Sequence, residues 1–219
     1  MRLPRSLSCL VLAFGLALPA TAHASAQAPL GGGSVLQSSA ATRCTAGFAA
    51  VSGKTGHLIA SSACGRPGDT IRSAGRVVGV VVGTQVPPTG AIVIRVTNTT
   101  DWRLVGSIPP VDSRVTITGS VEAPVGSSVC RYGATTGWHC GIIQAKNVSI
   151  TFPEGTLTGL TRTSVCAEPG DHGGPFVSGT QAQGVLVGGS GNCSSGGTTY
   201  FYPVNRVLSA YGLTLVTGT

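Results

Sequence analysis

The sequence predicts an all-β fold, and three features of its composition support this prediction. The 219 residues include 33 glycines and 13 prolines, which indicates a chain with many turns. Only 10% of the residues are charged while 42% are hydrophobic, so the chain lacks the composition of a disordered protein. Short apolar runs rich in valine and threonine alternate with turn residues, a pattern typical of sandwiches and barrels.

The expected strands follow one another along the chain between turn signals. The run at 77–82 is apolar throughout, as in a strand that is buried on both faces. A short C-terminal helix is expected at Asn205–Tyr211, because its apolar residues have helical spacing. The predicted strands are Ala46–Val51, Val77–Val82, Ala91–Val96, Arg114–Val121, Ile142–Phe152, Thr156–Val165, Gly184–Gly188 and Thr198–Pro203.

Residues 1–26 have the pattern of a secretory signal peptide. Arg2 and Arg5 form a basic start, the run at 7–18 is largely apolar, and small residues with cleavage-site spacing occupy 22–26. The apolar run is too short to span a bilayer, and no second run of spanning length follows. We therefore expect a secreted, extracellular protein with no membrane span, cleaved near residues 24–26.

The remaining chain divides into two unequal parts. Residues 27–42 are rich in Ala, Gly and Ser and are expected to be a flexible N-terminal lead-in, whereas 43–219 should form the folded domain. The formal net charge of the whole chain is +7, but its basic residues are scattered and not interleaved with aromatic residues. This charge pattern argues against nucleic-acid binding. As a separate expectation, the protein is a monomer.

Six of the seven cysteines are expected to form disulfides. Cys9 lies in the signal segment, and an even number remains for an oxidising compartment. A zinc site is the alternative, but no pair has C-x-x-C spacing, so we expect neither a metal nor another cofactor. A lipid anchor at Cys9 is disfavoured because most of the apolar run follows that residue.

Four segments together resemble the chymotrypsin-fold serine proteases, in the streptogrisin and α-lytic protease branch. They are Cys-Ala-Glu-Pro-Gly-Asp-His-Gly-Gly-Pro at 166–175, Gly-Trp-His-Cys-Gly at 137–141, Gly-Gly-Ser-Gly-Asn-Cys at 188–193, and Gly-Gly-Thr-Thr-Tyr-Phe-Tyr-Pro-Val at 196–204. The resemblance implies two six-stranded antiparallel β-barrels with the active site between them. It also implies the disulfides Cys44–Cys64, Cys130–Cys140 and Cys166–Cys193.

The resemblance also identifies the catalytic positions, and two of the three are substituted. His172 occupies the nucleophile position, which is serine in the family, and Ala63 occupies the histidine base position. The segment Asp-Trp-Arg-Leu-Val at 101–105 implies that Asp101 is the retained triad carboxylate. A serine that supports this carboxylate in the family matches Val187. Gly170 and His172 should supply the backbone N–H groups of the oxyanion site.

The remaining histidines, serines and carboxylates suggest structural roles and two alternative sites. His57 and His139 are interpreted as structural histidines. Ser61 or Ser62 as a replacement nucleophile is a minor alternative, and so is a metal site at His172, Asp101 and Asp171, since two or three such ligands are few for catalytic zinc. We expect replacement donors for Asp101, either local backbone groups, Ser61 or Ser62, or water.

The sequence therefore predicts a secreted serine protease homologue that is catalytically inactive and binds a peptide or protein ligand. Gly189, Ser190 and Gly191 match the segment that pairs with extended substrate in the family, and Tyr202 is a further peptide-binding candidate. Two alternatives remain: an active secreted endopeptidase of the streptogrisin type, and a structural cell-envelope protein with a vestigial cleft.

Overall fold

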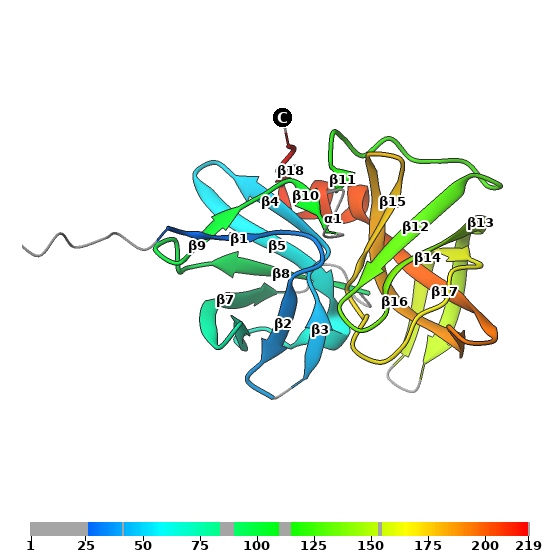
Figure 1. Cartoon of the computed structure of the whole chain (residues 1–219), viewed down its shortest axis with the longest axis horizontal. Coiled ribbons are helices and arrows are strands. Elements are labelled where there is room, and N and C mark those ends of the chain that lie inside the picture. The colour runs from blue at the N-terminus through cyan, green and yellow to red at the C-terminus, as the bar shows by residue number, and fades with distance from the viewer. Residues whose placement is uncertain (1–25, 41, 84–89, 110–114, 153–154, 219) are drawn as a thin grey trace, which may run out of the picture.

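The computed structural model describes residues 26–40, 42–83, 90–109, 115–152 and 155–218. Two halves rich in strands lie side by side, with the first half on the left of Figure 1 and the second on the right. Nearly all of the predicted signal peptide lies outside the described residues, so it stays a prediction. No helix in the described ranges has the length and apolar character needed to cross a membrane.

The second half is a closed barrel of six strands, which confirms the expected barrel. Its strands pair in the order β12-β13-β14-β17-β16-β15, and every pairing is antiparallel. A closed barrel leaves no unpaired sheet edge along its closed part. The bounds are β12 Ser128–Gly133, β13 Gly137–Phe152, β14 Gly155–Thr163, β15 Pro175–Ser178, β16 Gln181–Asn192 and β17 Gly196–Pro203.

The first half is an eight-stranded antiparallel sheet in the order β18-β4-β5-β8-β7-β6-β2-β3. Side chains alternate between the two faces along each strand, and one face supplies the interior of this half. The edge strand β18 comes from the C-terminal end of the chain and pairs with β4. The bounds are β2 Val35–Ser38, β3 Arg43–Thr45, β4 Phe48–Ser52, β5 Thr55–Ser61, β6 Thr70–Ser73, β7 Arg76–Gly83, β8 Ala91–Val96 and β18 Thr214–Leu215.

The expected flexible lead-in is wrong, because this segment is part of the fold. β1 (Ala28–Leu30) pairs in parallel with β9 (Trp102–Leu104), and β2 lies in the large sheet. Leu30 and Leu36 have no exposed surface and belong to the core of the first half. The segment is rich in Ala, Gly and Ser, but the burial of its two leucines holds it in the fold.

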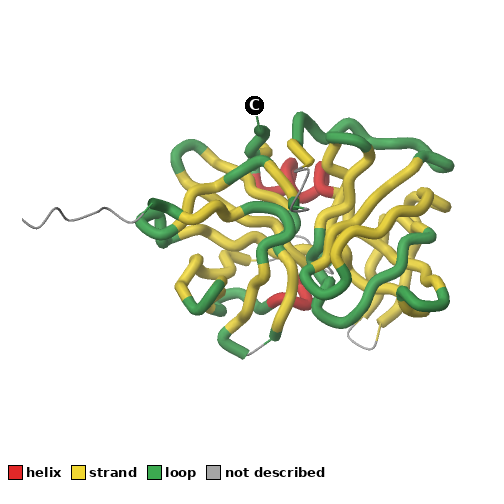
Figure 2. Tube along the Cα trace, in the orientation of Figure 1, coloured by secondary structure: helices red, strands yellow, loops and turns green. Residues whose placement is uncertain are grey.

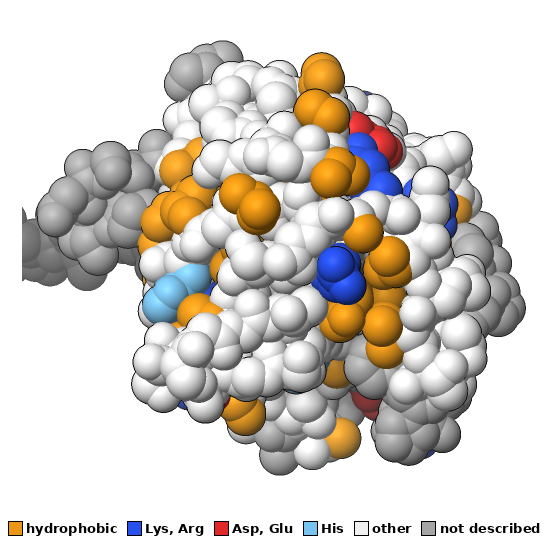
Figure 3. Space-filling model, turned by 90° about the vertical axis from the view of Figure 1, so that its right-hand side faces the viewer, with side chains coloured by type: hydrophobic (Ala, Val, Ile, Leu, Met, Phe, Trp, Pro, Cys, Tyr) orange, Lys and Arg blue, Asp and Glu red, His pale blue; other side chains and the backbone are white. Residues whose placement is uncertain are grey.

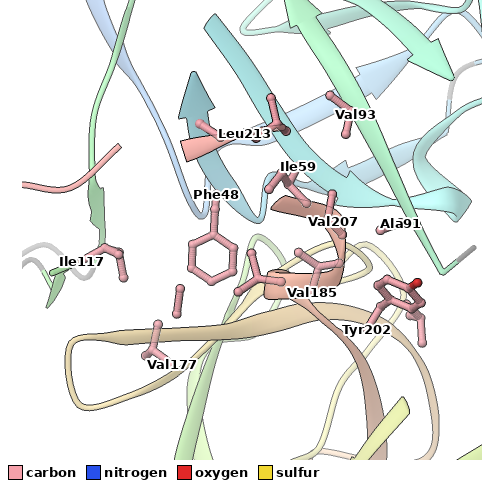
Figure 4. Packing of buried hydrophobic residues seen from close by; sticks show 14 of the residues in the cluster. Phe48, Ile59, Ala91, Val93, Ile117, Val177, Val185, Tyr202, Val207 and Leu213 are labelled. Carbon is pink, nitrogen blue, oxygen red and sulfur yellow. The ribbon is translucent and has the colours of Figure 1, made fainter. Parts of the chain in front are cut away.

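Besides the hydrophobic core inside each half, a further hydrophobic cluster joins the two halves. Phe48, Ile59 and Val93 extend from the first half, and Val177, Val185 and Tyr202 from the second, as Figure 4 shows. Helix α1 (Val204–Tyr211) adds Val207 to this inter-barrel core. Figure 2 shows α1 between the halves. The predicted C-terminal helix is thus confirmed, and it ends at Gly212, whose left-handed backbone suits glycine.

Most of the predicted strands lie within observed ones, but one prediction is too long. In place of a strand at Arg114–Val121, β11 covers only Val115–Thr116 and pairs with β10 (Ser107–Ile108). The N–H of Ile117 donates to the carbonyl of Gly106, beside β10, whereas the N–H of Thr118 donates to the carbonyl of Thr180. The chain therefore changes its pairing segment directly after β11. Arg114 is outside the described residues.

The three implied disulfides are all present. They join Cys44 to Cys64, Cys130 to Cys140, and Cys166 to Cys193. The first lies in the first half, and the other two lie in the second. On the face of the second half drawn in Figure 3, charged side chains are few and dispersed.

Candidate functional site

The loop between β14 and β15 carries the residues that the sequence singled out as the nucleophile segment. The N–H of Asp171 donates to the carbonyl oxygen of Glu168 at 3.1 Å, which closes a four-residue turn. Pro169 and Gly170 occupy its central positions, and Gly170 has a φ of +95°. A turn of this form needs glycine at its third residue, because L side chains disfavour positive φ.

Asp171 anchors this loop inside the second barrel. Its carboxylate accepts hydrogen bonds from the N–H groups of Glu168 and Thr135, and from the hydroxyl of Thr136 at 2.7 Å. The guanidinium of Arg131 lies 3.2 Å from it, and both side chains are fully buried. Burial opposes ionisation of Asp171, but these hydrogen bonds and the Arg131 charge outweigh burial and hold its pKa below the ordinary value.

The loop also contacts the first half of the protein through Thr45. The hydroxyl of Thr45 donates to the carbonyl of Gly170 at 2.9 Å, and its N–H donates to the carbonyl of His172 at 2.8 Å. A Cβ added to Gly173 would lie 2.3 Å from the Thr45 carbonyl oxygen and 3.0 Å from the Ser61 nitrogen. Only glycine fits here, and the close approach brings His172 beside the end of β5.

The end of β5 continues into a short 3-10 turn, Ser62–Cys64, that holds Ala63. Ser61 begins this turn, and its hydroxyl accepts the N–H of Ala63 at 3.2 Å. Ser62 donates its N–H to the carbonyl of Gly90 at 3.1 Å. Gly90 in turn is so close to Val187 that an added Cβ would lie 2.6 Å from the valine Cγ1. This chain of contacts brings Ala63, Gly90 and Val187 together.

His172 itself is half-buried at the junction of the two halves. Burial lowers its pKa, and the neighbouring Asp171 carboxylate offsets this only in part. The imidazole is therefore neutral near pH 7. Neither a carboxylate nor a hydroxyl in the described residues forms a hydrogen bond with its ring, so nothing orients it as a catalytic base.

The backbone of the turn retains two unpaired donors. The N–H groups of Gly170 and His172 have no hydrogen-bond acceptor among the described residues. These are the two groups expected to face an oxyanion. A pair of free N–H groups on one tight turn can bind a carbonyl or carboxylate oxygen.

The structure corrects the expectation for Asp101. Strand β8 runs antiparallel to β5, with Ala91 opposite Ser61 and Arg95 opposite His57. Asp101 follows the far end of β8, whereas Ala63 lies beyond the near end, so the two are at opposite ends of the strand pair. Asp101 is held by Asn98 instead, whose amide donates to the carboxylate at 2.8 Å and whose oxygen accepts the Asp101 N–H.

The residue beside the base loop is therefore Gly90, which the sequence reasoning missed. The motif Asp-Trp-Arg-Leu-Val looked like the expected carboxylate segment, but strand register decides which residue faces Ala63. A signal was present, because the strand Ala91–Val96 was predicted correctly and Gly90 immediately precedes it. Of the alternative donors expected for Asp101, Ser61 and Ser62 are not used in the described structure, and the nearby Asn98 takes this role.

The expected peptide-binding segment forms the exposed end of β16. Gly189, Ser190 and Gly191 are exposed and pair on one side with Thr199, Thr198 and Gly197 of β17. On the other side, β15 pairs with β16 only between Gln181 and Val185. Among the described strands, the edge at 189–191 is thus free to pair with an added strand.

Tyr202 does not join that segment. It is only 5% exposed and lies in the inter-barrel core against Gly90, so it is a packing residue and not a peptide-binding one. His139 contacts the carbonyl of Thr136 at 3.2 Å, in keeping with a structural role. Its nearby sulfur atoms are those of Cys166 and Cys193, which are bound to each other and unavailable as thiolates.

Comparison with known proteins agrees with this arrangement. A family model described as Trypsin matches residues 88–210, more than half of the chain. Streptogrisin-C of Streptomyces griseus is 49% identical over 196 residues, which cover 88% of this chain and 42% of that protein. Streptogrisin-A of the same organism is 36% identical, with 86% and 62% covered. The chain thus spans about half the length of these curated relatives.

Solved structures give the same result. Thermobifida fusca Protease A is 44% identical, with a TM-score of 0.81, and the match covers 87% of this chain and all of that one. Nocardiopsis Protease has the same TM-score and coverage at 42% identity. Together with the fold of two barrel-like β halves and the matched Trypsin model, these similarities show that the chain belongs to the trypsin family of chymotrypsin-fold serine proteases, in its streptogrisin and α-lytic protease branch.

Proposed function

We propose that this protein is a secreted, catalytically inactive member of its family that binds an extended peptide or a protein segment. One observation carries the proposal. The residues that meet where the triad would lie are Ala63, Gly90, Val187 and His172. They offer no hydroxyl or thiol beside an imidazole that a carboxylate orients, which is the arrangement that acyl transfer needs.

Magnitudes support inactivity. Loss of one triad member leaves only about 10³–10⁴-fold acceleration over water, and losses within this unit are not additive. Here the nucleophile, the base and the carboxylate are all replaced in the proposed alignment. The free N–H groups of Gly170 and His172 account at most for that residual rate.

Peptide binding is supported by the parts that remain. The free edge at 189–191 provides backbone donors and acceptors for an added strand, and the turn at Gly170 provides two more donors. Such a site recognises main chain and therefore binds extended segments. The three disulfides fit an extracellular protein, in line with the proposed signal peptide.

Two other functions remain as alternatives. An active endopeptidase of the streptogrisin type is favoured by the family relation and would need a base and a nucleophile from other residues. A structural cell-envelope protein with a vestigial cleft would bind no peptide. Hydrolysis and peptide binding distinguish all three, so both must be measured.

The first test is hydrolysis by the purified chain without its signal segment. We expect no turnover of a broad peptide library above buffer and no covalent labelling by a phosphonate probe directed at activated serine. Turnover or labelling would overturn the proposed inactivity.

The second test rebuilds the site with Ala63→His, Gly90→Asp, His172→Ser and Val187→Ser together. Val187→Ser is required because any Cβ at position 90 would collide with the valine. We expect phosphonate labelling and measurable peptidase activity. The matched control carries the same changes but His172→Ala, and it must not be labelled. Labelling of both variants, or of neither when both are folded, would contradict the proposed alignment.

The third test is peptide binding, followed by calorimetry or by backbone amide shifts in NMR. We expect extended peptides to bind, with shifts at 189–191. The same peptides N-methylated at alternate backbone positions should bind about tenfold more weakly or not at all, because each lost amide hydrogen bond costs about 0.5–1.5 kcal/mol. The absence of any binding would favour the vestigial cleft.

A further inference from the structure

A pocket of about 280 Å³ lies away from the candidate active site, on the face of β5 and β8 that meets the C-terminal segment. His57 lies six residues before Ala63, which is roughly 20 Å along an extended chain. The lining residues are Ser52, Thr55, His57, Val82, Val93, Arg95, Tyr211 and Leu213. Val93 and Leu213 lie in the upper part of the inter-barrel core in Figure 4, and both line the pocket.

The pocket combines an apolar base with a basic wall. Val93 and Leu213 belong to the inter-barrel core, so they form a fixed hydrophobic surface. Arg95 and His57 are direct partners in the β5–β8 register and therefore point to the same side of the sheet. Arg95 is exposed and forms no salt bridge with a described acidic residue.

No described carboxylate neutralises this wall. None of the eight lining residues is acidic, and the described ion pairs involve other residues. Ser52 and Thr55 lie opposite each other at the end of the β4–β5 hairpin and add hydroxyl groups. A free guanidinium beside hydroxyls and an imidazole is suited to a planar anion, because arginine binds a carboxylate through two parallel hydrogen bonds.

We propose that this pocket is a binding site for a carboxylate group carried on a compact hydrocarbon body. Arg95 binds the carboxylate, with Ser52 or Thr55 as further donors, and Val82, Val93 and Leu213 contact the hydrocarbon part. The volume admits a ligand of aromatic-acid or amino-acid size, below the usual range for drug-sized ligands. The carboxylate is either a free small acid or an acidic side chain of another protein, and the two sources are distinguished below.

The neighbouring histidine makes the proposed binding sensitive to pH. Burial lowers the pKa of His57, its contact with the Thr55 carbonyl at 3.1 Å acts against this, and the Arg95 charge lowers the pKa further. Arg95 on β8 and Tyr211 at the end of α1 are the other ionisable groups in the pocket. A bound anion favours protonated His57, so affinity rises as the pH falls toward the lowered pKa of this histidine.

Calorimetric titration of the full mature chain with benzoate tests the proposal, with benzamide as the neutral isostere. We expect saturable binding of benzoate and none of benzamide. Arg95→Gln should weaken benzoate binding about tenfold or more, since a charged hydrogen-bonded pair contributes about 1.5–3 kcal/mol. Arg162→Gln removes an exposed strand arginine from the other barrel and should leave the affinity unchanged.

A second arm uses the peptide acetyl-Ala-Glu-Ala-amide and its Gln counterpart. If the acidic peptide binds and this binding is lost in Arg95→Gln, the site is supported and the carboxylate comes from a protein side chain. If benzoate binds but the peptide does not, the carboxylate comes from a free acid. The rise in affinity at low pH should disappear in His57→Gln. The proposal is overturned if neither acid binds, or if Arg95→Gln and Arg162→Gln have equal effects. The test is independent of the proposed peptide site, which uses other residues.

Discussion

At the scale of single residues, the buried pair of Arg131 and Asp171 connects stability with the shape of the candidate site. Asp171 is followed directly by His172, and its hydrogen bonds hold the turn at Gly170. The Nη1 atom of Arg131 lies 3.2 Å from the Asp171 carboxylate and forms the ion pair without the geometry of a hydrogen bond, while the other guanidinium nitrogens donate to Thr136 and to the Cys166 carbonyl. The ion pair is thus formed, but one nitrogen of the buried guanidinium lacks a hydrogen bond.

We predict that Arg131→Met destabilises the protein by about 3–5 kcal/mol, because it leaves the Asp171 charge buried without its cation. Urea unfolding followed by circular dichroism measures the change. Arg162→Met, at an exposed strand position, is the control and should change stability by about 0.5 kcal/mol or less. The double change Arg131→Met with Asp171→Asn should recover part of the loss. Equal stability of the two single variants would contradict this role.

Two histidines, one buried and one half-buried, predict a loss of stability in mild acid. The pKa values of His57 and His172 are both lowered in the folded protein, chiefly by burial. The folded state therefore binds fewer protons than the unfolded state. Their contribution to stability is fully present above the unfolded pKa of about 6.5 and is lost as the pH falls through the lower folded values.

We therefore expect the unfolding midpoint in urea to fall as the pH decreases below the unfolded pKa of about 6.5. The change should be smaller in His57→Gln with His172→Ser than in the unmodified protein. His139→Gln is the control, since this residue is partly exposed and stays outside both sites. The explanation fails if the double variant keeps the full dependence on pH.

At the scale of elements, β1 shows how a short segment contributes through one side chain. Leu30 is fully buried in the core of the first half, whereas its neighbour Pro29 is exposed on the same strand. We predict that Leu30→Ala destabilises the protein by about 2–5 kcal/mol. Pro29→Ala should have little effect. Thermal unfolding compares the two variants, and a stability of Leu30→Ala equal to that of Pro29→Ala would restore the idea of a flexible lead-in.

Strand β1 also shows which elements of the fold can be predicted from the sequence and which cannot. Strands β8, β14 and β17 follow from local apolar runs between turn residues, and so does α1. β1 does not, because its partner β9 is more than seventy residues away and the pairing is parallel. Local patterns do not encode such a pairing.

Register accounts for the error in the candidate site. A local motif selected Asp101, but the antiparallel pairing of β5 with β8 puts the start of β8, and hence Gly90, beside the base loop. Ala63 and His172 could be located from the sequence, because Ala63 directly precedes Cys64 and His172 directly precedes two glycines. Asp171 is held by the fold through Arg131 and Thr136, so it does not join Asp101 in the alternative metal site.

At the scale of the whole molecule, the two halves share one hydrophobic core and one returning segment. After α1 the chain goes back to the first half, where β18 pairs with β4. Val207 and Leu213 thus fix the second half against the first. Since the candidate site lies where the halves meet, this shared core determines how its two sides are aligned.

The two tryptophans allow this coupling to be measured, because each half contains one. Trp102 lies in the core of the first half and donates its ring N–H to the Val77 carbonyl, and Trp138 packs in the second half against Tyr132. Trp138→Phe leaves a reporter of the first half, and Trp102→Phe leaves a reporter of the second.

We predict that fluorescence of each single-tryptophan variant changes together with its own circular dichroism during urea unfolding, since a shared core makes the transition cooperative. Adding Val207→Ala with Leu213→Ala removes side chains from both sides of the returning segment. Each truncation of a buried aliphatic residue costs about 1–5 kcal/mol, so this pair should move both reporters to lower urea. Transitions that already differ before these truncations would show that the halves unfold independently. In that case the alignment of His172 with Ala63 would depend on Thr45 and the loop contacts alone.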